Sequence, residues 1–83
     1  MSTARIETAH RHAAVTASDT ADISLIDGRT CRALRIGGAG NVVVVDQGGT
    51  AVTYTCVAGE VLLIEARRVN STNTTATGIV AWF

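Results

Sequence analysis

The chain has 83 residues, and seven arginines balance seven acidic residues in the absence of any lysine, so its formal net charge is zero. This balance argues against a nucleic-acid binder, because such proteins gain most of their affinity by neutralising phosphates. The uninterrupted apolar runs at 42–45 and 61–64 are far shorter than the roughly 20 residues that span a membrane.

A chain of this length buries only about 60–65% of its unfolded surface, so a monomer would be marginally stable. The usual remedies are disulfides, a metal or oligomerisation. No cluster of metal ligands is visible in the sequence, and no cofactor or metal is expected. Cys31 and Cys56 would form a bridge only if their strands were neighbours, and in a reducing compartment we interpret them as small buried hydrophobes. Oligomerisation is therefore favoured.

Residues 1–14 are predicted to form an N-terminal arm, and residues 15–83 a β-domain. The arm holds both histidines and a single large aliphatic residue, Ile6, which is too little apolar surface for a core of its own. We expect it to become ordered against a partner. A first strand is predicted at 13–17, where the arm meets the domain.

The next part of the chain alternates turns with short apolar segments. A polar turn at 18–22 precedes a short apolar stretch, and Asp27-Gly28 is a strong turn pair. A strand is predicted over 30–36. Arg32 and Arg35 cannot share a face of period two, so we expect a bulge or a solvated face there.

The centre of the chain has the pattern of successive strands. The glycine-rich segment 37–40 is interpreted as a hairpin connection, because a dinucleotide-binding loop would have to open a helix and valines follow instead. The four valines at 42–45 are typical of a strand covered on both faces. Residues 50–57 alternate, which places Val52, Tyr54 and Cys56 on one face.

Two further strands are predicted at 61–69 and 77–83, separated by a polar turn at 70–73. Glu65 and Arg67 would then share a face and form ion pairs within or between subunits. Proline is absent, and turn signals recur about every 8–12 residues, as in sandwiches and barrels. The predicted fold is all-β, a small antiparallel β-sandwich or barrel.

No catalytic constellation can be assembled from these residues. The histidines, His10 and His12, lie in the arm without a third metal ligand nearby. The aspartates sit at predicted turns, where their side chains bond the backbone. Because a nucleophile, a base and an orienting group do not come together, the chain is not expected to be an enzyme.

Several segments, in their order and spacing, resemble one known family. They are residues 18–22 (SDTAD), 32–37 (RALRIG), 40–44 (GNVVV), 49–54 (GTAVTY), 57–59 (VAG), 67–69 (RRV) and, most distinctively, 74–82 (TTATGIVAW). This pattern resembles the head-spike base protein family of gene transfer agent particles and of related tailed phages of alphaproteobacteria. The resemblance extends over most of the chain from about residue 15.

The resemblance implies a structural role on the outside of an icosahedral head, where members join the shell to a projecting fibre. The implied partners are the major capsid protein, a head-spike fibre protein and further copies of the chain. A pentamer at a five-fold vertex is the implied form, and a trimer is the alternative. Synthesis in the bacterial host cytoplasm and a final location on the virion head surface are expected. No nucleic acid or membrane is expected as a partner.

Two groups of residues are predicted to make these contacts. The arm would touch the capsid or a neighbouring subunit through Arg5, Ile6, Glu7, His10 and Arg11. The subunit interface would contain Arg32, Arg35, Glu65, Arg67, Trp82 and Phe83.

A second function stays open from the sequence. The chain could be a carbohydrate- or protein-binding β module, tail-associated or cellular, with Tyr54 and Trp82 as stacking residues. Packing in the core or at an interface is favoured for both, since large aromatic side chains in small domains are mostly buried.

Overall fold

The computed structural model describes residues 8–83 and contains seven strands. The predicted contact residues Arg5, Ile6 and Glu7 lie outside this part of the chain. The strands are β1 (His12–Ala14), β2 (Ala33–Gly38), β3 (Gly40–Val45), β4 (Ala51–Cys56), β5 (Val61–Leu62), β6 (Arg68–Asn70) and β7 (Thr77–Trp82). No residue from 8 to 83 is helical. Accordingly, this range contains no helix long and apolar enough to cross a membrane.

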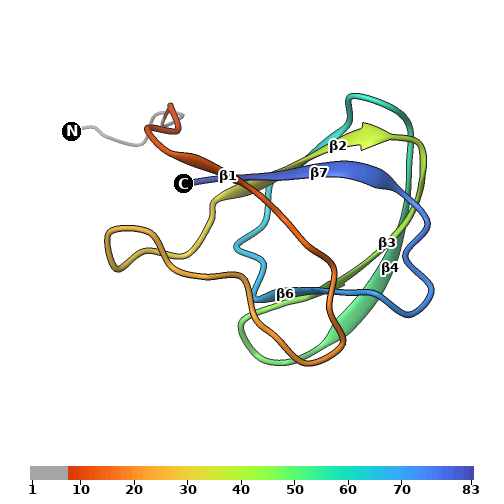
Figure 1. Cartoon of the computed structure of the whole chain (residues 1–83), viewed down its shortest axis with the longest axis horizontal. Coiled ribbons are helices and arrows are strands. Elements are labelled where there is room, and N and C mark those ends of the chain that lie inside the picture. Colours follow the sequence, from red (N-terminus) through yellow and green to blue (C-terminus); the bar gives the residue numbers. More distant parts are fainter. Residues whose placement is uncertain (1–7) are drawn as a thin grey trace.

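The strands form two antiparallel sheets that pack face to face (Figure 1). The first sheet has the order β1-β7-β2-β5, and the second has the order β4-β3-β6. In the first sheet Leu34 lies opposite Ala81 on one side and Leu62 on the other. The all-β prediction is confirmed, and the architecture is a small sandwich.

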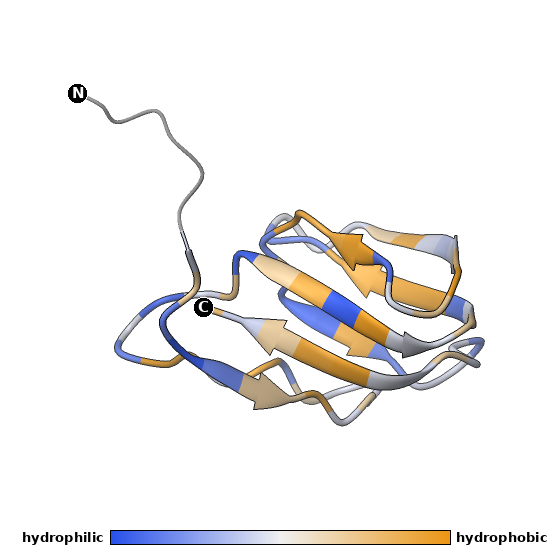
Figure 2. Ribbon diagram, turned by 90° about the horizontal axis from the view of Figure 1, so that it is seen from above, coloured by the Kyte–Doolittle hydropathy of each residue, from blue (hydrophilic) through white to orange (hydrophobic). Residues whose placement is uncertain are grey.

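Alternation along the strands builds the core between the sheets. Ile79 and Ala81 of β7 and Phe83 beyond it are buried, whereas the residues between them are only half-buried. All four valines of β3 are buried, as predicted for a strand covered on both faces. Figure 2 shows apolar segments along β2 and β7, interrupted in β2 by one hydrophilic segment. The core therefore lies between the two sheets and contains residues of both.

The glycine-rich connection is a corner between the sheets, so the hairpin prediction was wrong. β2 pairs with β7 and β5, and β3 pairs with β4 and β6. A Cβ on Gly37 would lie 2.8 Å from the Gly78 carbonyl oxygen, and a Cβ on Gly40 would lie 2.7 Å from the Ala76 nitrogen. Glycine is needed because the start of β7 and the two residues before it pass close to this corner.

The predicted strand 61–69 is also two separate strands. β5 pairs with β2 in the first sheet, and β6 pairs with β3 in the second. Between them the chain crosses the edge of the sandwich, where the Arg67 amide donates to the Val45 carbonyl at 2.8 Å. A pattern of apolar residues does not reveal that a strand changes partners, and for this reason Glu65 and Arg67 do not share a strand.

The first strand begins one residue earlier and ends three residues earlier than predicted, within the segment assigned to the arm. Its pairing with β7 continues outward, since the His10 amide donates to the Phe83 carbonyl at 2.9 Å and the Phe83 amide donates to Arg11 at 2.8 Å. Residues 10–14 therefore extend the first sheet, because β7 would otherwise expose an unpaired edge.

Two smaller predictions are confirmed by the structure. Asp27 and Gly28 form a tight turn with positive φ values of 53° and 73°, closed by the Ile26–Arg29 bridge. Cys31 and Cys56 are both buried and free. Burial raises the pKa of both thiols, which disfavours the reactive thiolate.

Candidate interaction surface

The outward face of the first sheet carries an apolar surface. Residues opposite one another in register share a face, so Trp82 lies beside His12 and Ala33, and Val80 lies beside Ala14 and Arg35. The core residues Ile79 and Ala81 point the other way. We call this face, with the neighbouring residues Val61 and Leu63 of the β5 edge, the Trp82 surface.

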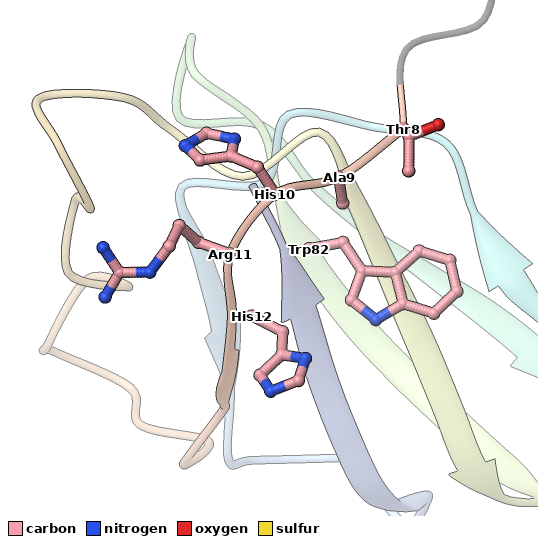
Figure 3. A pocket seen from close by; sticks show the side chains of 6 residues that line it. All are labelled: Thr8, Ala9, His10, Arg11, His12 and Trp82. Atoms are coloured by element: carbon pink, nitrogen blue, oxygen red, sulfur yellow. The ribbon is translucent and has the colours of Figure 1, made fainter.

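Trp82 stands between two hollows. The first, of about 660 Å³, is lined by residues 8–12 and Trp82. Figure 3 shows the indole beside Thr8 and Ala9, with the His12 ring on the β1 side. The second hollow, of about 870 Å³, is lined by Trp82, Leu63, Ala33, Arg29, Arg32 and Glu65, among others. Trp82 therefore lines both hollows and is within reach of a partner that enters either one.

The exposure of Leu63 sets this surface apart from an ordinary protein exterior. Its side chain is 86% exposed, the highest value among the large exposed hydrophobic residues from 8 to 83. Val61 is 38% exposed and lies opposite Arg35 in the β2–β5 register. Exposed apolar side chains gathered around a tryptophan are typical of a surface that a partner covers.

The charges near Trp82 are mainly positive. Arg35 is exposed and Arg32 half-buried, and neither has a carboxylate partner among residues 8–83. Glu65 also borders the second hollow, and its carboxylate accepts a weak hydrogen bond from Thr30 at 3.5 Å. Arginine pairs with carboxylates in two-pronged geometry better than lysine does, so Arg32 and Arg35 suit an acidic partner.

Arg67 is engaged within the chain. Its Nε donates to Asp22 Oδ2 at 3.0 Å, and Arg68 Nη1 donates to Asp22 Oδ1 at 3.1 Å. The hydrogen bond from Arg67 and the charges of both arginines lower the pKa of Asp22. Arg67 thus forms an ion pair within its own chain, and its partner is Asp22, a residue of the 18–22 segment that was predicted as a turn. A separation of 45 residues gave no signal for this pair.

Phe83 does not belong to the interaction surface. Its side chain is 1% exposed and packs in the core of its own chain. The subunit-interface prediction for Phe83 was therefore wrong, because the alternation that turns Trp82 outward turns Phe83 inward. Tyr54 is partly buried and packs against the same core, which makes it a poor stacking platform.

The described part of the predicted arm is fastened to the Asp27 turn. Arg11 Nη1 lies 3.3 Å from Asp27 Oδ2, and His10 Nε2 lies 3.5 Å from the same oxygen. All three side chains are about half exposed, so each pair contributes little stability. The two contacts place the entry into β1 beside the 26–29 turn.

No protein-family model and no curated protein matches this chain. Among the solved structures, the chain is similar along most of its length to a chain in the capsid of a native GTA (gene transfer agent) particle computed with C5 symmetry. The two chains are 44% identical with a TM-score of 0.79, and the match covers 90% of this chain and 83% of the other. The chain belongs to the family of this GTA particle protein. The resemblance to gene transfer agent proteins is thus confirmed at the level of the particle, and the head-spike base assignment stays a prediction.

Within this GTA particle family the identity is high enough to carry over the fold. The sandwich of residues 8–83 and the matched chain share the same arrangement, as the TM-score of 0.79 shows. The Trp82 surface, by contrast, is described from the residues of this chain alone and not from the matched chain.

Proposed function

We propose that the chain is a structural virion protein on the outside of a capsid, a head-spike base or decoration protein that links the shell to a projecting fibre. The observation that carries this proposal is the match to a chain of the GTA capsid at 44% identity. The role is not enzymatic. The partners would be the major capsid protein, a head-spike fibre protein and further copies of the chain, with no nucleic acid and no membrane. The protein would be made in the bacterial host cytoplasm and end on the virion head surface.

The geometry supports a division of labour along the chain. The sandwich would be the rigid unit, and the N-terminal segment with Arg5, Ile6 and Glu7 would dock on the capsid or a neighbouring subunit. Because residues 10–14 belong to the first sheet, the docking part is the segment that precedes them. His10 and Arg11 would act by fixing where this segment leaves the domain.

We favour a homopentamer at a five-fold vertex, with a trimer as the alternative. A chain of 83 residues has a small core, and assembly offsets that weakness. The Trp82 surface, with Arg32 and Arg35 on it, offers an apolar contact area. The matched capsid was computed with C5 symmetry, which is compatible with a component that follows the five-fold axis.

Cryo-electron microscopy of purified particles tests the proposal. Particles from the host that carries this gene should show the 8–83 sandwich on the head exterior, and particles from a deletion strain should lack that density. Restoring the gene should restore it. A head surface that is identical with and without the gene would overturn the proposal.

A carbohydrate- or protein-binding module is the second candidate, and the accessibility of Trp82 favours it. An indole with a hollow on each side can stack on a sugar ring or receive an apolar side chain. A glycan array is the discriminating measurement. Binding of a defined sugar that is lost in Trp82→Ala and kept in Tyr54→Phe would support this candidate, and an array without any signal would reject sugar binding.

A further inference from the structure

Strand β4 presents a row of unpaired backbone groups along its outer edge. The Asp46 amide donates to the Thr50 carbonyl at 2.9 Å, so these two opposite residues are a hydrogen-bonded pair of the β3–β4 ladder. In an antiparallel ladder hydrogen-bonded and non-bonded pairs alternate. The backbone groups of Val52, Tyr54 and Cys56 are therefore hydrogen-bonded to β3. The amides and carbonyls of Ala51, Thr53 and Thr55 then point away from β3.

The other side of β3 agrees with this assignment. Val45 accepts a bond from the Arg67 amide, Asn41 accepts one from the Thr75 amide, and the Val43 amide donates to Thr74 Oγ1. The backbone groups of the odd-numbered residues of β3 therefore point toward the β6 side, as the alternation of the β3–β4 hydrogen bonds requires. Within the range 8–83, no hydrogen bond engages the outward backbone groups of Ala51, Thr53 or Thr55.

The other sheet edges are short, charged or covered, whereas the β4 edge is open. The outer edge of β6 is covered in part by the 18–23 segment, through the Ser18 amide on Val69 and the Ile23 amide on Arg67. β5 has two residues, and β1 has three and begins at a histidine. β4 has six residues without a charge or a proline, and Ala51, Val52, Thr53 and Thr55 are exposed. Proteins rarely leave such an edge unprotected.

We propose that the β4 edge receives residues 1–7 of a neighbouring copy as an added strand. The proposal rests on the oligomer in the proposed function and names the contact that builds it. Seven extended residues span about 23 Å and a six-residue strand about 20 Å, so the lengths match. The segment contains Ser2, Thr3 and Ala4 ahead of its charged residues, which suits pairing with the uncharged β4 edge.

The topology favours a neighbour's segment over the chain's own. The chain enters β1 at one edge of the first sheet and continues along β6, to which Ser18 bonds. β4 lies at the opposite edge of the second sheet, beyond β3. Figure 1 shows the start of the described chain and β4 on opposite sides of the molecule. A donor on one side and an acceptor on the other make a head-to-tail contact, which forms a closed ring when the rotation between neighbours closes, as the proposed pentamer requires.

Disulfide trapping on purified particles tests the contact directly. The double variant with Ala4→Cys and Thr53→Cys should give a ladder of linked chains on mild oxidation, and an equimolar mixture of the two single variants should stop at linked pairs. Because register can slip by two residues, Ala51→Cys and Thr55→Cys are paired with Ala4→Cys as well. The buried native thiols, with their raised pKa values, should stay unlinked in the wild type.

The controls separate the possible outcomes. Ala4→Cys with Ala58→Cys, an exposed turn residue just beyond β4, should give no ladder. The proposal is overturned by linkage of Thr53→Cys to itself alone, by linkage only within one chain, or by the absence of any product with positions 51, 53 and 55. If these negative results come from particles that still carry the chain, the proposed function stands while this contact fails.

A second test removes one outward amide without touching the β3 ladder. Thr53→Pro should fold, since proline is tolerated where an edge-strand N–H faces solvent. Loss of one intersubunit hydrogen bond should weaken association roughly two- to twelvefold per contact. Thr53→Val, which keeps the amide, should associate normally, and deletion of residues 2–7 combined with Thr53→Pro should be no worse than the deletion alone. Additive losses in the combined variant would argue against the pairing.

Discussion

Trp82 and Phe83 show how one step along a strand separates two roles. Phe83 fills the core, and Trp82 stands on the outer face between the two hollows. The same distinction applies to the arginines. Arg67 is held by Asp22, while Arg32 and Arg35 have no carboxylate within the range 8–83. The residues available to a partner are therefore Trp82, Leu63, Arg32 and Arg35.

The carboxylates of Asp19 and Asp22 should make stability depend on pH. Hydrogen bonds from Thr72 lower the pKa of Asp19, and the hydrogen bond from Arg67 lowers that of Asp22, in each case below the ordinary value of 3.8. A lowered folded-state pKa stabilises the protein above the unfolded pKa, and this stabilisation is lost as the pH falls through the folded value.

We therefore expect the double variant Asp19→Asn, Asp22→Asn to melt at a lower temperature than the wild type at pH 6. The difference should shrink as the pH falls below 3.8, where the wild-type carboxylates also become neutral. Thermal unfolding followed by circular dichroism at several pH values measures it. A difference that stays constant from pH 6 to pH 2.5 would contradict this linkage.

At the scale of elements, the periodicity of apolar residues predicted a strand correctly where the whole segment stays within one sheet. The alternation of β4 and the valines of β3 gave the correct strands within a residue or two. Periodicity failed where the chain changes sheets, at the 37–40 corner and between β5 and β6. The Asp22–Arg67 pair could not be predicted either, since it depends on how the 18–23 segment lies along β6.

The glycine corner should tolerate no side chain at Gly40. A Cβ there would meet backbone atoms of Ala76 and the Thr75 hydroxyl at 2.7–2.9 Å, and the φ of 150° already disfavours other residues. Because backbone cannot move aside cheaply, Gly40→Ala should destabilise the fold by about 1–3 kcal/mol.

Gly48→Ala is the matched control for this prediction. Its nearest neighbour would be Asp46 Oδ1 at 3.4 Å, an ordinary contact, so a change within about 0.5 kcal/mol is expected. Urea unfolding of both variants gives the two free energies. Equal effects would show that the close approach at the corner does not limit stability.

At the scale of the whole molecule, the sandwich has a small core and an apolar outer surface. The core is lined by short side chains, with Phe83 as its largest fully buried one. The Trp82 surface meanwhile leaves Leu63 and Val61 in solvent. A small core contributes little hydrophobic stabilisation to the isolated domain. Covering the Trp82 surface would bury further apolar area and add to that stabilisation, which is the physical reason to expect assembly.

Leu63→Ser separates this use of the surface from any role in folding. With 86% of its side chain exposed, Leu63 contributes little to the isolated domain, and its replacement should leave the melting temperature nearly unchanged. In a covered contact beside Trp82 its loss should cost about 1–2 kcal/mol, which weakens binding to particles by roughly five- to thirtyfold.

Leu25→Ser is the control, because Leu25 is 59% exposed and does not line either hollow beside Trp82. Particles from a deletion strain, titrated with each purified variant, report the two affinities. Equal affinity of the Leu63 and Leu25 variants would show that the Trp82 surface stays uncovered on the virion.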